Sequence, residues 1–476
     1  MIPILTSQDT PFEEIERIYN LQRQNRQEVK NSSSKDRCAK LTRLKKALHT
    51  KREEIKAAVH ADFSKPKEEV DLTEIYPLII EINAICKDLA TWMEPEDLQS
   101  PITMIGSVAS IVKEPKGNCL IMSPWNYPFQ LAISPIISAI AAGNVCMLKP
   151  SEFTPHTSKF IKKFIASVFD ESEVAVVEGG VEVSTQLLTL KFDHIHFTGS
   201  PAVGKVVMKA ASEHLTSVTL ELGGKSPVII DETADVTECA AKIGWGKFMN
   251  SGQTCIAPDY LFIHESKKQD FVKAMQLQLA KMYGQQPEQS QSIAHMVNAK
   301  HYTRVKTWLT EAIQNGATVE LGGEANDDKN FITPTLLSHV TADSKLLTEE
   351  IFGPILPMIS FKNVDEALQH INKNEKPLAL YIFSKKNKNI DYIMQNTSAG
   401  GTCINDTMIH QAHPNLPFGG VNNSGLGKSH GVWGFREFSN ERAVVRQYLK
   451  KGIVSFMYPP YNNFVRRIID LTLKFF

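Results

Sequence analysis

Residues 194–204 read His194-Ile-His-Phe-Thr-Gly-Ser-Pro-Ala-Val-Gly204, a short apolar strand that ends at Phe197 and runs through a glycine turn into a helix. The N–H groups at the start of a helix point outward, and Gly199-Ser-Pro-Ala-Val-Gly204 leaves room for a ligand beside them, so the junction suits a phosphate group. The spacing differs from the G-x-G-x-x-G of the usual dinucleotide fingerprint. Alone, the pattern therefore fits an ordinary turn as well as it fits a phosphate site.

Short apolar strands alternate with helices on both sides of this junction, over residues 118–221 and again over residues 223–422. Alternation of this kind indicates βαβ units and a parallel sheet. We expect two α/β regions that meet near Gly223-Gly224, with a cleft between them. The expected strands are 118–122, 145–148, 194–197, 217–221, 227–230 and 260–263, and the expected helices include 158–168 and 268–282.

Two stretches lie outside this alternation. Residues 102–112, with Gly106 inside, predict a strand or hairpin. Residues 464–476 predict an amphipathic helix, because their charged residues share one narrow arc and apolar residues fill the rest. Crossing a bilayer takes about 20 apolar residues, so this helix is too short to span one. Its apolar side has three candidate partners: a partner subunit, the chain's own surface or a membrane interface.

Charge and cysteine content limit the class of protein. The chain of 476 residues carries 52 basic and 52 acidic residues, so nothing global attracts it to nucleic acid. Its 7 cysteines include no C-x-x-C pair, which favours reduced thiols in a cytosolic compartment over disulfides or zinc. The 14 histidines lack metal-ligand spacing, so we predict no metal site. The first residues show no signal-peptide pattern, and we expect a cytoplasmic protein.

A cysteine lies at the centre of Asn250-Ser-Gly-Gln-Thr-Cys-Ile-Ala-Pro-Asp-Tyr260, where Gly252 and Pro258 bend the chain. A lone cysteine is more often packed than reactive. Two further stretches change that balance. Glu221-Leu-Gly-Gly-Lys-Ser-Pro227 offers a carboxylate beside a glycine turn, and Ser123-Pro-Trp-Asn-Tyr-Pro-Phe129 offers an amide between two prolines. A thiolate, a carboxylate base and an amide donor are the groups that acyl-thioester chemistry needs.

These stretches resemble the aldehyde dehydrogenase superfamily, and the resemblance covers nearly the whole chain. The matching motifs, in the family's order, are Pro124-Trp-Asn-Tyr-Pro128, Lys149-Pro-Ser-Glu152, Phe197-Thr-Gly-Ser200, Glu221-Leu-Gly-Gly224, Gly252-Gln-Thr-Cys255, Glu349-Glu-Ile-Phe-Gly-Pro354 and Pro417-Phe-Gly-Gly420. The stretch Asn423-Ser-Gly-Leu-Gly-Lys-Ser-His-Gly431, followed by Phe435, Phe438-Ser439 and Arg442, resembles the class 3 branch, which handles fatty and aromatic aldehydes.

The resemblance implies an α/β fold of the aldehyde dehydrogenase type. It implies a Rossmann-type NAD(P)-binding domain over residues 1–222, with an oligomerisation hairpin at about 101–117. A catalytic domain would follow over residues 223–422. Residues 423–476 would form a C-terminal segment with the amphipathic tail.

The same resemblance implies roles for three catalytic residues. Cys255 would attack the aldehyde carbonyl and form a thiohemiacetal, then a thioester. Asn126 and the backbone N–H of Cys255 would stabilise the oxyanion. Glu221 would be the base that activates water to release the carboxylic acid. Without the family, Asn126 is better read as a turn residue and Glu221 as a surface glutamate.

The cofactor would be NAD, with NADP as a second cofactor that class 3 members often accept. Glu152 favours NAD, because a carboxylate accepts hydrogen bonds from the ribose 2′-OH and repels a 2′-phosphate. Read from pattern alone, Lys149 is a solvated lysine and Phe352 an ordinary core aromatic. The residues that the family match assigns to the cofactor are Trp125, Lys149, Glu152, Gly199, Ser200, Gly204, Leu222, Glu350 and Phe352.

We therefore expect an NAD(P)-dependent enzyme that oxidises a medium- or long-chain aliphatic, or an aromatic, aldehyde to its acid. An acylating dehydrogenase that passes the thioester to coenzyme A is a rival, but it would not need the base Glu221. A non-catalytic relative of the lens crystallin type could lose Cys255, Glu221 or Asn126, yet all three are present. The expected partners are a second copy in a homodimer and a membrane surface that residues 464–476 touch peripherally. His410 and His413 are expected near the substrate mouth.

Overall fold

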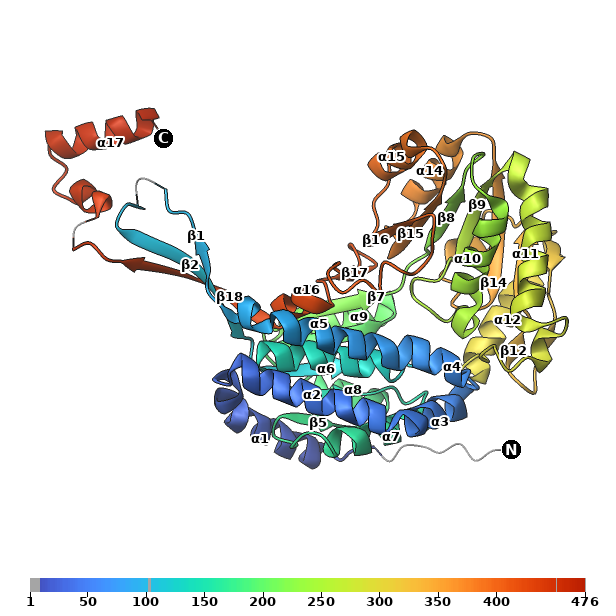
Figure 1. Ribbon diagram of the computed structural model, residues 1–476, viewed down its shortest axis with the longest axis horizontal. Helices are drawn as coiled ribbons and strands as arrows, with labels where there is room; N and C mark the ends of the chain where they lie inside the picture. Colours follow the sequence, from blue (N-terminus) through green and yellow to red (C-terminus); the bar gives the residue numbers. More distant parts are fainter. Residues whose placement is uncertain (1–8, 102–103, 451, 476) are drawn as a thin grey trace.

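The computed structural model describes residues 9–101, 104–450 and 452–475. Figure 1 shows two α/β units joined into one body, with an arm of β-strands that projects from it and a helix at the arm's tip. The fold class is α/β, as the sequence predicts.

The first large sheet has six strands in the order β17-β7-β6-β3-β4-β5. All its neighbours are parallel except β17, which runs antiparallel to β7. Strands β3 and β4 are buried along their whole length, which explains why they read as continuous apolar runs instead of alternating ones. The strands are β3 (Asn118–Met122), β4 (Val145–Lys149), β5 (Val174–Val176), β6 (His194–Gly199), β7 (Ser217–Leu222) and β17 (Gly425–Leu426).

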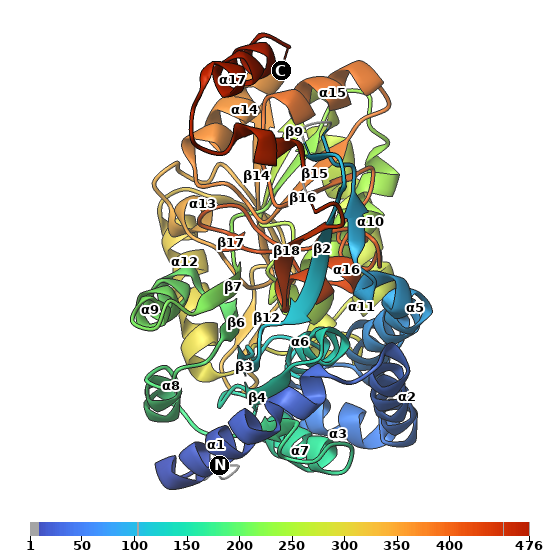
Figure 2. The ribbon, with the colours of Figure 1, turned by 90° about the vertical axis from the view of Figure 1, so that its left-hand side faces the viewer.

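Helices cover both faces of this sheet and bury two separate apolar cores (Figure 2). Helices α2, α3, α5, α6, α7 and α16 pack in one core, and α1, α8 and α9 pack in the other. Their bounds are α1 (Phe12–Lys30), α2 (Ser34–Thr50), α3 (Arg52–Phe63), α4 (Lys67–Val70), α5 (Tyr76–Met93), α6 (Gln130–Ala142), α7 (Pro155–Ala166), α8 (Val181–Leu187), α9 (Pro201–Ser212) and α16 (Gly431–Glu437). A π-helical turn, η1 (Asp71–Ile75), joins α4 to α5.

The second large sheet has seven strands in the order β10-β13-β14-β9-β8-β15-β16, and only the edge strand β10 is antiparallel to its neighbour. Its strands are β8 (Pro227–Ile230), β9 (Tyr260–His264), β10 (Thr318–Leu321), β13 (Thr335–Ser338), β14 (Ile355–Phe361), β15 (Ala379–Phe383) and β16 (Gly401–Ile404). A two-stranded ribbon consists of β11 (Ala325–Asn326) and β12 (Phe331–Ile332). The helices of this part are α10 (Val236–Phe248), α11 (Lys268–Tyr283), α12 (Ala299–Gln314), α13 (Lys345–Thr348), α14 (Val364–Lys373) and α15 (Asn387–Gln395).

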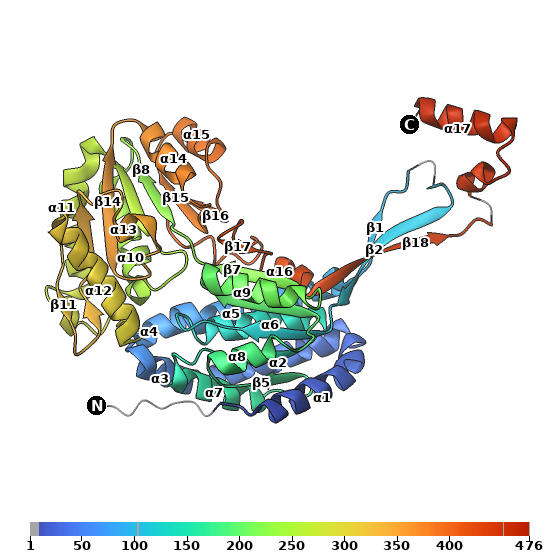
Figure 3. The same cartoon turned by 180° about the vertical axis from the view of Figure 1, so that it is seen from behind.

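The arm is a three-stranded antiparallel sheet in the order β1-β2-β18, seen from behind in Figure 3. Its strands are β1 (Glu96–Leu98), β2 (Ser107–Pro115) and β18 (Ser439–Gln447). The sequence predicts one strand or hairpin over 102–112, but the strand begins at Ser107, because Gly106 with φ 89 turns the chain there. Residues 102–103 of that expected range lie outside the described residues. The long partner of β2 is β18, from the other end of the chain, and not a strand within 101–117.

The expected junction at Gly223-Gly224 lies between β7 and β8, so it separates the last parallel strand of the first sheet from the first strand of the second. Within the described residues, no helix combines the length and the apolar character needed to cross a membrane. The assignment of one unit to the cofactor and the other to catalysis stays a prediction at this point.

Candidate active site

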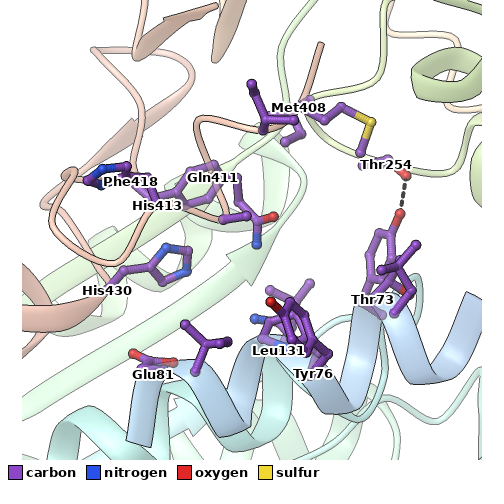
Figure 4. Close-up of a pocket in the computed structure, with 18 of the residues that line it drawn as sticks. Thr73, Tyr76, Glu81, Leu131, Thr254, Met408, Gln411, His413, Phe418 and His430 are labelled. Atoms are coloured by element: carbon purple, nitrogen blue, oxygen red, sulfur yellow. Dashed lines mark hydrogen bonds between the residues drawn. The ribbon is translucent and has the colours of Figure 1, made fainter. Parts of the chain in front are cut away.

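A cavity of about 200 Å3 opens beside the carboxyl end of β7 and the loop that precedes β9. Apolar and aromatic side chains form most of its wall, including Tyr76, Leu131 and Phe418 (Figure 4). Cys255 and Glu221 both line it, so the structure brings these two predicted catalytic residues to one cavity. Residues from five separated parts of the chain, near positions 72–84, 127–131, 198–221, 245–256 and 408–431, make up the wall.

Cys255 follows a tight turn that the local sequence dictates. Asn250, Ser251 and Gly252 have φ values of 53, 52 and 72, and a run of left-handed residues reverses the chain after α10. Glycine is required at 252, since a Cβ there would lie 2.3 Å from the carbonyl oxygen of Gly353. The side chain of Gln253 fixes the turn further, because its Nε2 donates to the carbonyl of Asn250 at 3.0 Å.

The electrostatic surroundings of Cys255 disfavour the thiolate. Burial raises the pKa of the thiol, and the nearby carboxylates of Glu350 and Glu221 raise this pKa further. The backbone N–H groups of Cys255 and Ile256 act in the opposite direction. The cysteine is therefore a neutral thiol until a charge near it changes.

Asn126 lies beside the cysteine turn and is only 3% exposed. Its Nδ2 donates to the backbone carbonyl of Gln253 at 3.1 Å, and the backbone carbonyl of Asn126 accepts from Asn250 Nδ2 at 2.8 Å. A side-chain amide carries two N–H donors. One N–H of Asn126 is thus used to fix the amide, and the second remains for a ligand oxygen.

Glu221 ends β7 and is 6% exposed. Its Oε1 accepts a hydrogen bond from the hydroxyl of Ser429, and its Oε2 accepts one from Thr198 Oγ1 at 3.3 Å. Burial raises the pKa of this carboxyl, while His430 and the two hydroxyls partly counteract the rise. A buried, oriented carboxyl with a raised pKa suits a general base.

Aromatic rings surround Trp125, the residue that precedes Asn126 in the chain. The ring of Phe352 meets that of Trp125 edge to face at 5.3 Å, and His301 lies 4.7 Å from Trp125 on another side. Phe352 has φ 49, a left-handed conformation that a bulky residue adopts only when its surroundings impose it. This strain at one of the predicted cofactor residues is typical of a functional site.

Glu350 is a second buried carboxyl close to Cys255. Burial raises its pKa to about 8, and its Oε1 has no hydrogen-bond partner among the described residues. Its Oε2 would lie 2.1 Å from a Cβ placed on Gly223, so the glycine makes room for the carboxylate. An unpartnered buried oxygen needs an explanation, and a ligand hydroxyl would satisfy it.

The other predicted cofactor residues lie at or just beyond the carboxyl ends of strands in the first sheet. Lys149 Nζ forms an ion pair with Glu152 Oε2 at 2.8 Å. Ser200 caps α9 by accepting from Val203 N at 3.4 Å. Gly204 and Leu222 pack against each other, because a Cβ on Gly204 would lie 2.6 Å from Leu222 Cδ2, so this glycine serves the close approach of α9 to β7. A Cβ on Gly199 would lie 2.5 Å from the ring of Phe197.

Several contacts to these residues carry no signal in the local sequence. Thr198, Ser429 and His430 approach Glu221 from other segments, and the hydroxyl of Tyr127 lies 2.6 Å from Thr254 Oγ1, the bond marked at Thr254 in Figure 4. Thr198, Ser429, His430 and Tyr127 all lie within motifs quoted from the sequence, but the motifs do not show which residues these side chains contact.

Of the two histidines expected near the substrate mouth, His413 lines the cavity and His410 does not. His410 lies between the wall residues Ile409 and Gln411, and its own ring packs beside Gly401 and Tyr381. The described residues contain no group of three or more side chains suited to hold a metal ion.

The chain is similar to known proteins in both sequence and fold. The model of the aldehyde dehydrogenase family matches residues 3–444. The chain belongs to the aldehyde dehydrogenase family. The 4,4'-diaponeurosporen-aldehyde dehydrogenase of Staphylococcus aureus is 43% identical over 441 residues, which cover 92% of this chain and 94% of that protein. Aldehyde dehydrogenase family 3 member B2 of Mus musculus is 40% identical and covers 91% of this chain and 90% of its own.

Solved structures agree with these relatives. A substrate-bound Staphylococcus aureus AldH superposes with a TM-score of 0.91 at 41% identity, covering 96% of this chain and 99% of its own. PnpE in complex with nicotinamide adenine dinucleotide shares the fold, with a TM-score of 0.84 at 24% identity over 92% of this chain and 91% of its own. The predicted aldehyde dehydrogenase of the class 3 type, using NAD(P), is thereby confirmed, and so is the predicted fold.

Proposed function

We propose that this aldehyde dehydrogenase works through Cys255 as nucleophile, Asn126 as oxyanion donor and Glu221 as base. The observation that supports this most directly is that Cys255 and Glu221 face one largely apolar cavity while Asn126 is fastened to the turn that carries the cysteine. The thiol of Cys255 loses its proton to solvent water, the resulting thiolate sulfur forms a bond to the aldehyde carbon, and the C=O π pair moves to the carbonyl oxygen, which takes up the negative charge. The free N–H of Asn126 and the backbone N–H of Cys255 stabilise that charge.

The remaining steps concern the acyl group on sulfur. Loss of hydride from the carbon leaves a thioester, whose carbon a water oxygen attacks. Glu221 takes a proton from that water, the C–S bond breaks, and the acid leaves while Cys255 regains its electrons. Thr198 and Ser429 hold Glu221 in orientation, and burial raises its pKa toward the range in which a base is useful.

The residues fit a nicotinamide cofactor, which supplies the hydride acceptor when it is bound. The N-terminus of α9 offers N–H groups beside Gly199 and Ser200 for a pyrophosphate. The unpartnered Oε1 of Glu350 would accept from a ribose hydroxyl, and Phe352 and Trp125 would lie near the ring. Lys149 and Glu152 would hold the adenosine ribose, with Leu222 lining the same side.

We expect NAD to be preferred, although the ion pair with Lys149 weakens the repulsion that Glu152 exerts on a 2′-phosphate. Glu152→Gln removes the repelling charge and leaves Lys149 free to attract that phosphate. The ratio of kcat/KM for NADP to that for NAD should therefore rise by about tenfold, which corresponds to one favourable charge contact. A ratio that stays unchanged would remove Glu152 from the cofactor site.

The cavity favours an apolar aldehyde. Its wall offers Tyr76, Trp245, Met249 and Met408, with Gln411 and His413 among the few polar groups. An apolar wall adds about 0.8 kcal/mol of binding for each buried methylene. We expect kcat/KM to rise with chain length along a series of straight-chain aldehydes. One relative is named for the aldehyde 4,4'-diaponeurosporen-aldehyde.

The experiment that tests the reaction is aldehyde-dependent formation of NADH by the purified protein, with Cys255→Ala as the comparison. We expect turnover by the natural chain, no turnover by the variant, and NAD binding by both in a fluorescence titration. Substantial oxidation by Cys255→Ala would contradict the covalent route.

The further partners we propose are a second copy of the chain and a membrane surface. The arm carries an exposed antiparallel sheet, and sheet edges pair readily with another chain. Helix α17 (Asn463–Phe475) lies at the tip of the arm and buries only Val465. Within one chain it therefore does not dock on the body. A cytoplasmic homodimer with peripheral membrane contact through this helix accounts for both features.

A further inference from the structure

Lys65 and Glu74 form an ion pair whose side chains are both 0% exposed, with Nζ and Oε1 2.7 Å apart. Taking two charges out of water costs several kcal/mol, and such a pair is seldom more stabilising than apolar residues of the same size. The pair is therefore better explained by the geometry it imposes than by the stability it adds.

Glu74 fixes the backbone that follows Asn126. Its second oxygen, Oε2, accepts from Phe129 N at 2.9 Å and from Gln130 N at 3.2 Å. These two N–H groups lie at the start of α6, where a carboxylate is favoured by the helix dipole. Glu74 thus fastens the segment that carries the oxyanion donor to the π-helical turn η1.

Lys65 reaches the other side of the same segment. Its Nζ lies 3.9 Å from the centre of the Tyr127 ring, a short cation–π contact. The hydroxyl of Tyr127 lies 2.6 Å from Thr254 Oγ1, and Thr254 directly precedes Cys255. Contacts therefore run without a gap from the buried pair to the nucleophile, through one tyrosine.

The pair also borders the substrate cavity. Glu74 lies in η1, and the neighbouring Leu72, Thr73 and Tyr76 line the cavity wall (Figure 4). A π-helical turn is rare and often marks a functional site. Here it places Glu74 against the segment that follows Asn126 and its neighbours in the wall of the cavity.

We propose that Lys65 and Glu74 are positioning residues for aldehyde oxidation: together they hold Asn126 and the Thr254–Cys255 turn at the separation that attack on the carbonyl requires. This inference rests on the proposed roles of Cys255 and Asn126. It predicts that loosening the link slows formation of the thiohemiacetal and thioester without weakening the binding of aldehyde or NAD.

Two variants test the link at different depths. Tyr127→Phe removes only the hydroxyl that bonds Thr254 and keeps the ring over Lys65. The double variant Lys65→Met with Glu74→Gln removes both charges, and the glutamine oxygen still accepts from Phe129 and Gln130. Arg52→Gln is the matched control, because Arg52 Nη2 pairs with Asp71 Oδ2 at 2.6 Å on the same π-helical turn but near the surface.

The measurements are kcat, KM for aldehyde and NAD, the rate constant and amplitude of the first NADH burst, and the melting temperature. We expect Tyr127→Phe and the double variant to lower kcat and the burst rate constant together by about 10- to 100-fold, the loss typical of a displaced reacting group. KM should stay within about twofold, which separates positioning from binding. Arg52→Gln should match the natural chain in every kinetic quantity.

If the double variant does not fold, the kinetics of Tyr127→Phe alone test the proposal. Burst rate constants that match the natural chain overturn the proposal. So does a fall in burst amplitude at an unchanged rate constant, which would show only a loss of folded enzyme. If the natural chain forms no NADH from any aldehyde, it is the proposed function that fails, before any variant is compared.

Discussion

Glu221 and Glu350 are both buried carboxyl groups that raise the pKa of the Cys255 thiol. The effect of Glu350 on the thiol depends on whether Glu350 itself is ionised. Burial raises the pKa of Glu350 to about 8. Below that pH Glu350 is neutral and cannot oppose the thiolate, and above it the carboxylate does. Replacing Glu350 by glutamine should therefore speed alkylation of Cys255 mainly above pH 8.

The test is the rate of carbamidomethylation of Cys255 by iodoacetamide in the absence of cofactor. We expect the alkylation rate of Glu350→Gln, divided by that of the natural chain, to stay near 1 at pH 7 and to rise severalfold by pH 9. The reason is that a shift of one unit in the thiol pKa changes the thiolate concentration tenfold. Glu349→Gln is the control, because Glu349 is half exposed and pairs with Lys345. A ratio independent of pH would mean that Glu350 does not act on the thiol by its charge.

The base has its own kinetic signature. In the proposed mechanism Glu221 acts after hydride transfer, so Glu221→Gln should leave the first NADH burst within about twofold and lower steady-state turnover by 10²- to 10⁴-fold, the contribution typical of a general base. In the natural chain, deacylation should accelerate with pH as Glu221 loses its proton through a pKa raised by burial. Stopped-flow measurement of NADH separates the two phases. A burst reduced as much as turnover would assign Glu221 to the first step.

For individual residues, the sequence predicts which groups react, but it does not predict which side chains orient them. Cys255, Asn126 and Glu221 lie within local motifs, and local motifs survive without knowledge of the fold. Ser429 lies 208 positions from Glu221, and Tyr127 lies 127 positions from Thr254. No spacing rule joins residues so far apart, so the hydroxyls on Glu221 and the buried pair behind Asn126 emerge only in three dimensions.

Helix α5 brings a further buried carboxyl, Glu81, to the cavity wall. Its Oε2 accepts from Ser134 Oγ at 2.7 Å, and its Oε1 has no partner among the described residues. Burial raises its pKa to about 7. A carboxyl pKa that is higher in the folded than in the unfolded protein means that the neutral carboxyl stabilises the fold. This contribution of Glu81 to the free energy of unfolding is complete below the unfolded pKa and is lost as pH rises through 7.

Glu81→Gln should therefore stabilise the protein at high pH only. The amide keeps the shape and the acceptor for Ser134 but cannot ionise. We expect its melting temperature to exceed that of the natural chain at pH 8.5, by an amount equivalent to at most about 3 kcal/mol, and to match it at a pH below the unfolded pKa of Glu81. Asp88→Asn on the same helix is the control. An equal difference at both pH values would point to packing instead of charge.

The elements themselves were largely predictable, because buried parallel strands such as β3, β4 and β8 are continuous apolar runs with sharp ends. The arm was not. Residues 107–115 form their long ladder with residues 439–447, a pairing that contributes nothing to either local pattern. The pleat of β2 is partly exposed along its whole length, so the usual alternation of buried and exposed side chains is weak there.

The arm and α17 are the parts of the molecule that project from its body. Both project away from the two sheets and their helices, with the helix at the far end (Figures 1 and 3). Apolar side chains on α17 remain exposed, with Leu473 at 78% and Phe475 at 69%. Burying a leucine or phenylalanine is worth about 1.5–3 kcal/mol, so a surface of this kind binds another apolar surface. A protruding position suits the proposed contact of α17 with a membrane and the proposed pairing of the arm with a second chain.

Deletion of residues 464–476 separates these contacts. We expect the shortened chain to keep the dimer mass in light scattering and to lose co-sedimentation with anionic liposomes. The binding it loses should be weak and salt-dependent, because a single short helix is a marginal anchor and Arg466, Arg467 and Lys474 supply the attraction to acidic headgroups. Arg466→Glu with Arg467→Glu should reduce sedimentation while leaving the apolar residues in place. Loss of the dimer alone would instead place α17 between subunits, and a deletion that alters neither mass nor sedimentation would contradict both contacts.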